Sequence, residues 1–308
     1  MKPTQSQRPM RLALGPLTYF WPRQAVLDFY EQAARWPVDV VYLGETVCSR
    51  RRELKPSDWA DIAEKMAAAG KEAVLSTYEL IETDADLRVM RQVVENGRYP
   101  VEANDMGAVK RLADKGPFVA GPFLNIYNAS TLGFFAGIGA SRWVPPVELS
   151  GAGLRKVLAE APAGIETEVF AWGHLPLALS ARCFTARFHD LSKDHCDFRC
   201  LHDPDGLPLS TQEGEPFLLL NGVQTQSGRI QNLLPMVPKC REMGVDLLRL
   251  SPQSRDMAAI VELFAGVAKG GLDAHEAQRR LRALVPGGTC DGYWHGVAGL
   301  EQVEEMAA

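Results

Sequence analysis

The sequence lacks a surplus of positive charge. It has 33 lysine and arginine residues against 38 aspartate and glutamate residues, which gives a formal net charge of −5 at pH 7. Proteins that bind nucleic acids usually carry a basic surplus, because neutralisation of phosphates dominates their affinity. We therefore expect no nucleic-acid partner. The dense basic run at residues 49–52 is typical of a solvated loop, and its alternative interpretation is an anion site beside Cys48.

Long apolar segments are also missing. The longest apolar stretch, residues 132–140, is rich in glycine and much shorter than the roughly 20 residues that a membrane-spanning helix needs. Residues 1–9 are polar and contain no apolar segment behind a basic one, so they do not look like a secretory signal. We therefore expect a cytoplasmic protein that is not an integral membrane protein.

Several catalytic signatures are absent as well. The sequence contains no glycine-rich phosphate-binding loop, no nucleophile elbow and no metalloprotease helix with paired histidines. We also find no convincing set of serine, histidine and aspartate residues of the kind that activates a nucleophile in hydrolases. The chemistry must therefore depend on residues of another kind.

What the sequence does contain is an alternation of short β-rich runs with helix-like segments. Eight strand–helix units favour a closed, TIM-barrel-like (β/α)8 fold of the α/β class, with an open doubly wound sheet as the alternative. We expect a single barrel domain over residues 1–308, with a C-terminal tail over about 285–308. The predicted strands are short and look buried, as strands of a parallel sheet do, and they cover residues 11–14, 38–43, 72–76, 101–103, 118–120, 141–144, 166–171 and 245–250.

Boundary signals accompany the expected helices. Ser57 is in a position to cap a helix over residues 58–69, and Thr83 has capping-box spacing to Asp86. Residues 230–243 also look helical, although two prolines interrupt them. These signals place helices between consecutive predicted strands.

The chain contains six cysteines. In a reducing compartment they are better interpreted as metal ligands, catalytic thiols or small buried residues than as disulfides. After the seventh predicted strand, residues 174–215 form a long segment that we expect to be an irregular, functional loop. This loop contains Cys183, Cys196 and Cys200, whereas Cys48 follows the second predicted strand. Because loops that follow the strands of a parallel barrel emerge at one end, we expect all four cysteines to meet at the barrel mouth.

Four thiolates can hold an iron–sulfur cluster or a structural zinc ion, and unrelated buried thiols are the third possibility. Zinc sites usually show cysteine pairs two to four residues apart, whereas Cys48 and Cys183 have no such partner, so the spacing favours a cluster. Cys240 and Cys290 are not counted as ligands, because free cysteines commonly pack as small apolar residues. Nearby arginines would offset the charge of a thiolate-bound cluster, namely Arg50, Arg51, Arg182, Arg187 and Arg199.

Three charged residues are candidates for catalysis. Glu45 lies at the expected barrel mouth, where carboxylates act as acids, bases or ligands, although a structural cap or a solvated side chain is an equally good interpretation. Glu168 lies in a predicted strand and would be buried if it faces inward. Arg249 closes the last predicted strand and is a candidate clamp for a carboxylate, or else a member of an ion pair.

Two groups of segments carry a family resemblance. Residues 168–174 (EVFAWGH) followed by 180–183 (SARC) resemble the signature segment of the U32 peptidase-like family, which has a glutamate, a phenylalanine, a glycine and then Gly-x-Cys. Pro176 replaces a cysteine, and Ala181 a glycine, that many members carry at these positions. The branch of the family that serves ubiquinone biosynthesis is similar to this chain at residues 12–16, 176–187, 220–225, 249–253 and 290–294.

The resemblance implies a barrel fold and a [4Fe–4S] cluster held by Cys48, Cys183, Cys196 and Cys200. It also implies an iron–sulfur subunit of an oxygen-independent hydroxylase that acts on the aromatic ring of ubiquinone precursors. Such a subunit would form a heterodimer with a UbiU-like protein and use prephenate as the oxygen donor. A UbiT-like lipid carrier of the sterol-carrier type would assist with the prenylated phenol substrate. Two alternatives stay open, a U32-type protease and a non-catalytic subunit with a structural metal.

Overall fold

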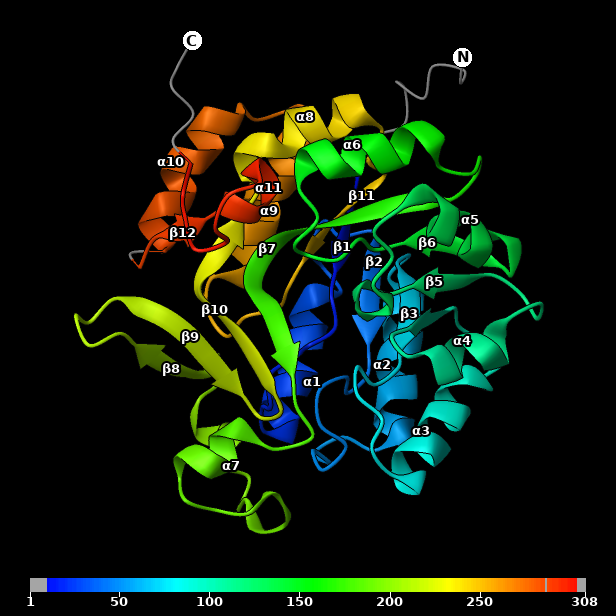
Figure 1. The fold of residues 1–308 in the computed structure, drawn as a ribbon, viewed down its shortest axis with the longest axis vertical. Helices are drawn as coiled ribbons and strands as arrows, with labels where there is room; N and C mark the ends of the chain where they lie inside the picture. The colour runs from blue at the N-terminus through cyan, green and yellow to red at the C-terminus, as the bar shows by residue number, and fades with distance from the viewer. Residues whose placement is uncertain (1–9, 286, 304–308) are drawn as a thin grey trace.

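The computed structural model describes residues 10–285 and 287–303 and contains a closed barrel of parallel strands (Figure 1). The last strand of the barrel, β11, pairs in parallel with both β1 and β7, which closes the sheet and excludes the open alternative. The predicted TIM-barrel-like fold is thus confirmed. In order around the barrel the strands are β1 (Arg11–Leu14), β2 (Val40–Leu43), β3 (Glu72–Ser76), β4 (Val101–Ala103), β5 (Phe118–Ala120), β6 (Ala140–Trp143), β7 (Glu166–Leu179) and β11 (Leu247–Leu250). Residues 1–9, on which the expectation about secretory signals depends, lie outside the described ranges.

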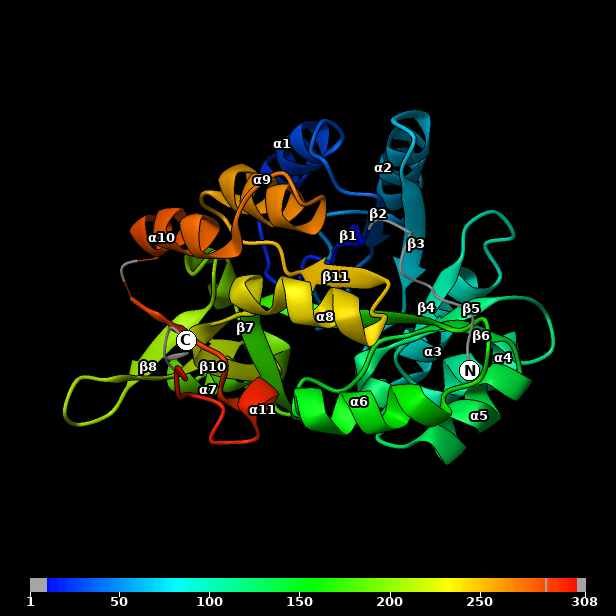
Figure 2. The same cartoon turned by 90° about the horizontal axis from the view of Figure 1, so that it is seen from above.

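Helices connect successive strands and surround the barrel (Figure 2). They bury apolar faces against the strands, as Tyr30, Met66 and Phe264 do with side chains that are fully buried. None of the helices in the described ranges combines the length and the apolar character needed to cross a bilayer. The helices are α1 (Arg23–Ala33), α2 (Pro56–Ala68), α3 (Asp84–Val94), α4 (Met106–Leu112), α5 (Ala129–Gly137), α6 (Gly151–Glu160), α8 (Val237–Met243), α9 (Met257–Ala268) and α10 (Ala274–Leu284).

The two helix-capping predictions have opposite outcomes. The capping box of α3 is confirmed, because Thr83 Oγ1 accepts a hydrogen bond from the Asp86 amide and the Asp86 carboxylate accepts one from the Thr83 amide. The prediction that Ser57 caps α2 is wrong. Pro56 occupies the first helical position, where its missing N–H costs nothing, and the Lys55 amide donates to Asp58 Oδ2 at 2.7 Å.

A long excursion leaves the barrel between β7 and β11. Strand β7 continues beyond the barrel wall and pairs antiparallel with β10 (Gln224–Asn232), which pairs in turn with β9 (Pro216–Asn221) and then β8 (Leu207–Ser210). The interpretation of residues 230–243 as helical is therefore wrong over their first part, which belongs to β10. Strand β12 (Thr289–Cys290) also joins β10, and α11 (Gly292–His295) follows it.

Between β7 and β8 the chain folds into a small lobe at the bottom of Figure 1, residues 180–206, which we call the cysteine lobe. It contains helix α7 (Phe184–Phe188) and two short 3-10 turns, η2 (Lys193–His195) and η3 (Arg199–His202). Two further 3-10 turns, η1 (Pro122–Leu124) and η4 (Leu234–Met236), lie elsewhere in the chain. The expected irregular loop over residues 174–215 is thus partly regular, because β7 runs to Leu179 and β8 begins at Leu207.

Candidate metal centre

The loop that follows β2 presents Cys48. Gly44 turns the chain at a φ of 127°, and the Glu45 carboxylate then accepts hydrogen bonds from the amides of Val47 and Cys48, both at 3.0 Å. Glu45 therefore acts as a structural cap in this geometry, which is one of the two roles expected for it. Its effect is to fix the backbone of the loop just where the thiol of Cys48 is presented.

The cysteine lobe presents the other three thiols. Cys183 lies at the start of α7, where its Sγ accepts a hydrogen bond from the Ala186 amide at 3.4 Å. Cys196 ends η2 and Cys200 lies within η3. The two residues after Cys196, Asp197 and Phe198, adopt left-handed backbone conformations with φ of 48° and 51°, and they reverse the chain between the two cysteines.

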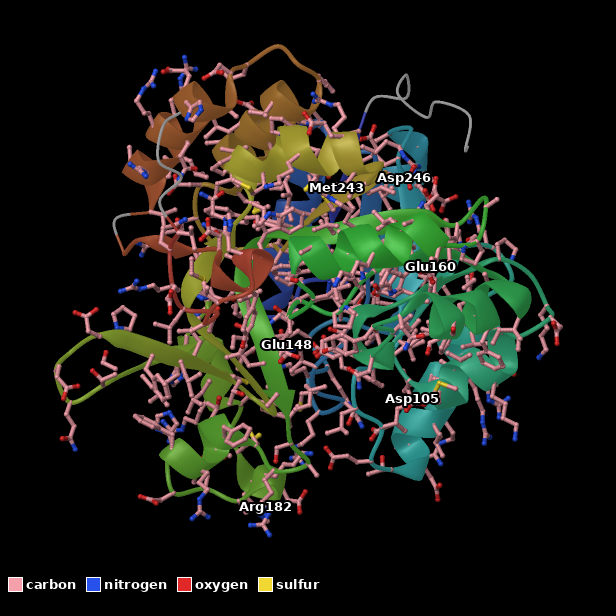
Figure 3. The ribbon with its side chains drawn as sticks, turned by 45° about the horizontal axis from the view of Figure 1, so that its top comes forward. Asp105, Glu148, Glu160, Arg182, Met243 and Asp246 are labelled. Carbon is pink, nitrogen blue, oxygen red and sulfur yellow. The ribbon has the colours of Figure 1, made fainter. Side chains whose placement is uncertain are left out.

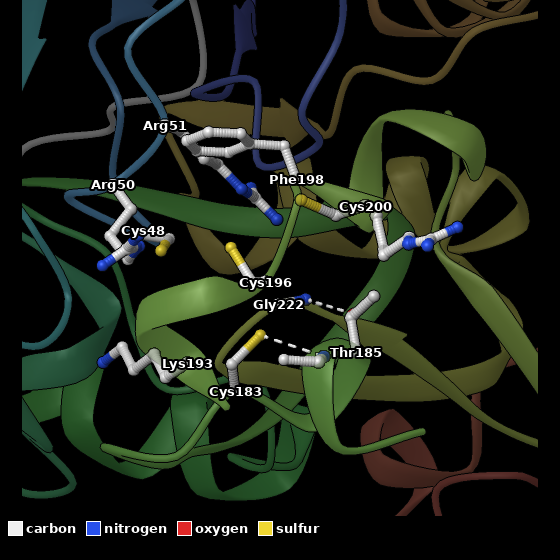
Figure 4. A pocket seen from close by; sticks show the side chains of 12 residues that line it. Cys48, Arg50, Arg51, Cys183, Thr185, Lys193, Cys196, Phe198, Cys200 and Gly222 are labelled. Carbon is white, nitrogen blue, oxygen red and sulfur yellow. Dashed lines mark hydrogen bonds between the residues drawn. The ribbon is translucent and has the colours of Figure 1, made fainter. Parts of the chain in front are cut away.

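The structure brings the four cysteines together. Each is half-buried, and all four line one pocket of about 360 Å³, into which their sulfur atoms point (Figure 4). The pocket lies beside the barrel mouth, between the loop after β2 and the cysteine lobe. Its other lining residues are Arg50, Arg51, Thr185, Ala186, Lys193, Phe198, Arg199 and Gly222.

Positive charge surrounds this pocket, but not from every arginine that the sequence suggested. Arg50, Arg51 and Arg199 line it, and Lys193 joins them. Arg182 and Arg187 are exposed, and Figure 3 shows Arg182 on the outer side of the lobe. The basic run at residues 49–52 is not simply a solvated loop, because the side chain of Arg51 is only 1% exposed.

Arg51 is the central cation of the pocket. It donates to the Thr18 carbonyl at 2.7 Å and to Asn221 Oδ1 at 2.6 Å, and it pairs with Glu45 at 3.7 Å. Burial raises the pKa of the Cys48 and Cys200 thiols, and the Arg51 guanidinium opposes that rise. Arg51 therefore favours thiolates at a site where burial alone would keep the thiols neutral.

The arrangement of the thiols bears on which group they can hold. Among the described residues, no three or more histidine, cysteine, aspartate or glutamate side chains are placed to hold one metal ion. The four thiols surround a space rather than converge on a point. A single zinc ion needs its ligands within about 2.3 Å of one centre, whereas in a cluster the thiolates bind different iron atoms.

The remaining sulfur and imidazole groups lie elsewhere. Cys240 and Cys290 are fully buried, Cys240 within α8 and Cys290 in β12, and neither lines the pocket. His195 and His202 are exposed on the lobe, and His189 is half-buried. The described residues therefore give the pocket four thiols and no imidazole among its lining groups.

Glu168 and Arg249 lie inside the barrel, away from the pocket. Arg249 Nε donates to Glu168 Oε1 at 2.6 Å, and its Nη1 lies 2.7 Å from Glu102 Oε1. All three side chains are buried. Although burial alone disfavours the charged form, the Glu102 and Glu168 carboxylates hold the pKa of Arg249 above its ordinary value. The ion-pair interpretation of Arg249 therefore describes this structure, and its charge is already balanced.

Sequence reasoning missed Glu79, which lies three residues beyond the end of β3. It is 7% exposed, and it accepts hydrogen bonds from Thr46 Oγ1 at 3.0 Å and Gln224 Nε2 at 2.7 Å. Burial raises its pKa to about 8, with a smaller contribution from nearby carboxylates. Its position just past a barrel strand, like that of Glu45, is the signal that could have identified it.

A chain of hydrogen bonds joins Glu79 to the cysteine pocket. Gln224 donates to Glu79, Asn221 Nδ2 donates to Gln224 Oε1 at 3.4 Å, and Arg51 donates to Asn221. The two amide side chains come from the β9–β10 hairpin, which was not expected to contribute to a site. The hairpin therefore connects the barrel mouth with the thiols.

Comparison with known families agrees with the segment resemblance. The family model described as peptidase family U32 matches residues 27–302. This chain belongs to peptidase family U32. Among solved structures it is similar to a U32 peptidase, with a TM-score of 0.45, 10% identity, and coverage of 82% of this chain and 97% of that one. It is also similar to dihydrodipicolinate synthase from Aquifex aeolicus, with a TM-score of 0.48, 11% identity, and coverage of 90% and 82%. At identities this low, neither solved structure indicates which reaction this chain catalyses.

Proposed function

We propose that the four-cysteine pocket holds a [4Fe–4S] cluster, with Cys48, Cys183, Cys196 and Cys200 as ligands. The observation that carries this proposal is the convergence of Cys48, from the loop after β2, with three cysteines of a lobe that is more than 130 residues further along the chain. Thiols that surround a space suit a group with several iron corners better than a single ion. The cationic lining offsets the charge that four thiolates bring.

We further propose that the chain is the iron–sulfur subunit of an oxygen-independent hydroxylase that acts on the aromatic ring of ubiquinone precursors. The segments that resemble UbiV, the ubiquinone-biosynthesis member of the family, supply the lining of two neighbouring pockets. Cys183 and Gly222 line the cysteine pocket, and Pro176, Gln224 and Arg249 line a pocket at the barrel mouth. Part of the similarity thus falls on residues that line candidate sites.

The chain's own residues have definable tasks in this proposal. Arg51 favours thiolates and holds the loop of Cys48 against the β9–β10 hairpin. Glu45 fixes the backbone of that loop. The cluster, when bound, would supply electron transfer. The partners that we propose are a UbiU-like protein in a heterodimer, prephenate as oxygen donor, a prenylated phenol as substrate and a UbiT-like lipid carrier.

A protease is the less favoured alternative. Ser192 Oγ lies 3.1 Å from His195 Nδ1, and both side chains are exposed within one turn of the cysteine lobe. An acyl-transfer site needs a group that orients the histidine, and it needs to exclude water. An exposed turn does not exclude water well. A non-catalytic subunit with a structural metal is the second alternative, and the activity measurement below separates it from the hydroxylase.

Metal content tests the cluster. Anaerobically reconstituted protein should contain close to four iron and four sulfide per chain, as a cubane with four thiolate ligands requires. Replacement of Cys48, Cys183, Cys196 or Cys200 by alanine should remove most of this iron, whereas Cys240→Ala should retain it. Iron retained in Cys48→Ala but lost in Cys240→Ala would overturn the ligand assignment, and stoichiometric zinc in colourless protein would overturn the cluster.

Activity tests the hydroxylase. The chain and its UbiU-like partner should together hydroxylate a prenylated phenol without dioxygen when prephenate is added, with product measured by mass spectrometry. The Cys196→Ala chain with the same partner is the control and should give no product. Full activity in that control would mean that the cluster of this chain has a structural role only.

A further inference from the structure

A second pocket lies at the barrel mouth, separate from the cysteine pocket. Its empty space, counted together with the open solvent at its entrance, is about 470 Å³. No cysteine lines it. Its polar wall comes from the ends of barrel strands and from β10, and consists of Thr18, Glu79, His174, Gln224, Gln226, Arg249 and Ser251.

Arg249, which lines this pocket, has one buried donor without a partner. The side chain is 3% exposed, its Nε and Nη1 are paired with Glu168 and Glu102, and its Cζ lies 4.0 Å from the centre of the Tyr42 ring. Its Nη2 atom is buried and has no hydrogen-bond partner. An unpaired buried donor is unfavourable, so a ligand oxygen that accepts from Nη2 would gain an interaction the protein does not supply.

The surrounding charges determine what kind of oxygen suits this donor. The Arg249 guanidinium faces two buried carboxylates, so it carries no unbalanced positive charge. A second guanidinium, that of Arg142, lies 3.9 Å from Glu168, but its charge is already shared with Glu72 and Glu166. A carboxylate ligand would bring a third negative charge beside Glu102 and Glu168, away from bulk water, where like charges repel strongly. The oxygen of a hydroxyl or carbonyl group accepts the same hydrogen bond without that repulsion.

The pocket lining also has an apolar part. Phe123, Val144, Val147 and Phe170 form it. Aromatic side chains favour a flat ring through stacked or edge-to-face contacts. On the polar side, the Thr18 hydroxyl is buried and also has no hydrogen-bond partner, so a second polar contact is available. One apolar wall and two unpaired polar atoms describe a site for a ring that carries oxygen.

We propose that the barrel-mouth pocket binds an uncharged ring that presents a hydroxyl or carbonyl oxygen to Arg249 Nη2, and that it discriminates against rings that carry a carboxylate. Small phenols and cyclic ketones belong to this ligand class. Arg249 is thus a specificity determinant for neutral oxygen and does not clamp a carboxylate.

This inference stands apart from the cluster. It depends on the barrel mouth, whose hydrogen bonds toward the cysteine pocket come from Arg51, Asn221, Gln224 and Thr46 and from none of the four cysteines. The full-length Cys196→Ala chain should therefore bind the same probes with the same affinity. Comparing p-cresol binding by the parent and Cys196→Ala chains therefore tests the pocket independently of whether the chain holds a cluster.

Two probes of similar shape test the charge discrimination. We expect p-cresol to bind the full-length chain saturably at pH 7, with a Kd on the order of 1 mM for so small a molecule. We expect 4-methylbenzoate, which is anionic at this pH, to bind at least tenfold more weakly. Ligand-observed nuclear magnetic resonance titration measures both. Equal or tighter binding of 4-methylbenzoate, or no saturable binding of p-cresol, would overturn the proposal.

Two variants locate the site. Val147→Trp should fill the half-buried apolar wall and weaken p-cresol binding at least tenfold, whereas Val297→Trp, the same change at an exposed position, should leave it unchanged. Thr18→Val removes a hydroxyl that has no partner within the protein, so the variant should fold normally and bind p-cresol about threefold more weakly. Unchanged binding in folded Thr18→Val and Val147→Trp chains would place p-cresol elsewhere and contradict the assignment.

Discussion

The barrel mouth and the cysteine pocket lie side by side and are constructed differently. At the mouth, Glu102, Glu168 and Arg249 come from three barrel strands, are fully or almost fully buried, and pair with one another. The cysteine pocket takes one side from the loop after β2 and the other from the cysteine lobe. Much of the lobe surface is exposed, and its contacts with the rest of the chain include ion pairs with solvent-accessible partners.

This difference indicates which interactions hold the side chains of each site in place. The barrel mouth is fixed by strand pairing and buried ion pairs, so it is preorganised without a ligand. Surface ion pairs contribute little stability, so the lobe gains less from its own contacts. A metal group that binds Cys48 together with three lobe cysteines would tie the lobe to the barrel, because ligands from both sides would then share one centre.

Removal of Arg51 should have the largest effect, because this residue joins the two regions. Arg51→Met removes the cation paired with Glu45 and the buried donor to Asn221 Oδ1, and it leaves the Thr18 carbonyl with the Asn221 Nδ2 hydrogen bond. We expect the free energy of unfolding to fall by about 3–5 kcal/mol, the range for breaking a buried ion pair from one side. Chemical denaturation of the anaerobically purified protein measures this change.

The neighbouring arginine is a matched control for that variant. Arg52 is exposed, so Arg52→Met removes the same charge from the same loop and should change stability by less than about 0.5 kcal/mol. Similar losses in the two variants would mean that net charge, and not the buried contacts of Arg51, stabilises the loop.

Glu79 should give the barrel mouth a pH dependence. Its folded pKa, which burial raises to about 8, lies above the ordinary value of 4.5. Between these values the folded chain holds a proton that the unfolded chain has released, so its contribution to stability is complete below about pH 4.5 and is lost as pH rises through about 8. Glu79→Gln cannot titrate, so its stability relative to the parent chain should improve between pH 5.5 and pH 8.5. Parallel denaturation midpoints at the two pH values would contradict the raised pKa.

The sequence predicted the barrel well, because the signals there are local. Short apolar runs bounded by turns predicted all eight barrel strands, five of them with the correct first residue. The same logic failed for residues 230–243 and for the ends of the cysteine loop. The last residues of β10 include the buried polar side chains Gln231 and Asn232, and buried polar residues conceal the strand pattern.

The meeting of the four cysteines in one pocket was also predictable, because thiols are rare and the topology of a parallel barrel places Cys48 at the end that carries the cysteine lobe. The role of Glu45 depends on whether the backbone of its own loop turns back toward its carboxylate, which residue types alone do not reveal. The role of Arg249 depends on Glu102 and Glu168, which are far from it in sequence, so the sequence left two interpretations open for it. Glu79 was missed for the same reason. Its environment is created by Thr46 and Gln224, which are not its neighbours along the chain.

The smallest expected effect tests how the cysteine lobe is held. Arg50 bridges the loop after β2 to η2 by contacting the Asp194 carboxylate at 3.2 Å and the Asp194 carbonyl at 2.8 Å, and the Asp194 side chain is 85% exposed. Arg50→Ala should therefore lower the free energy of unfolding by less than about 1 kcal/mol. Amide hydrogen exchange across residues 193–202 should nevertheless become faster in metal-free protein, while exchange in the barrel strands stays unchanged.

Arg35→Ala is the control for this variant, because Arg35 forms a solvent-exposed ion pair with Glu31 of α1, outside the cysteine lobe. It should leave exchange in the lobe unaffected. If Arg50→Ala also leaves it unaffected, the lobe is held by its own packing, for example by Phe198 against Phe20 with ring centres 5.9 Å apart. The cysteine lobe would then be ordered without a metal group, as the barrel mouth is ordered without a ligand. Faster exchange that returns to the parent rate on cluster reconstitution would instead show that a bound metal group replaces the surface contacts in ordering the lobe.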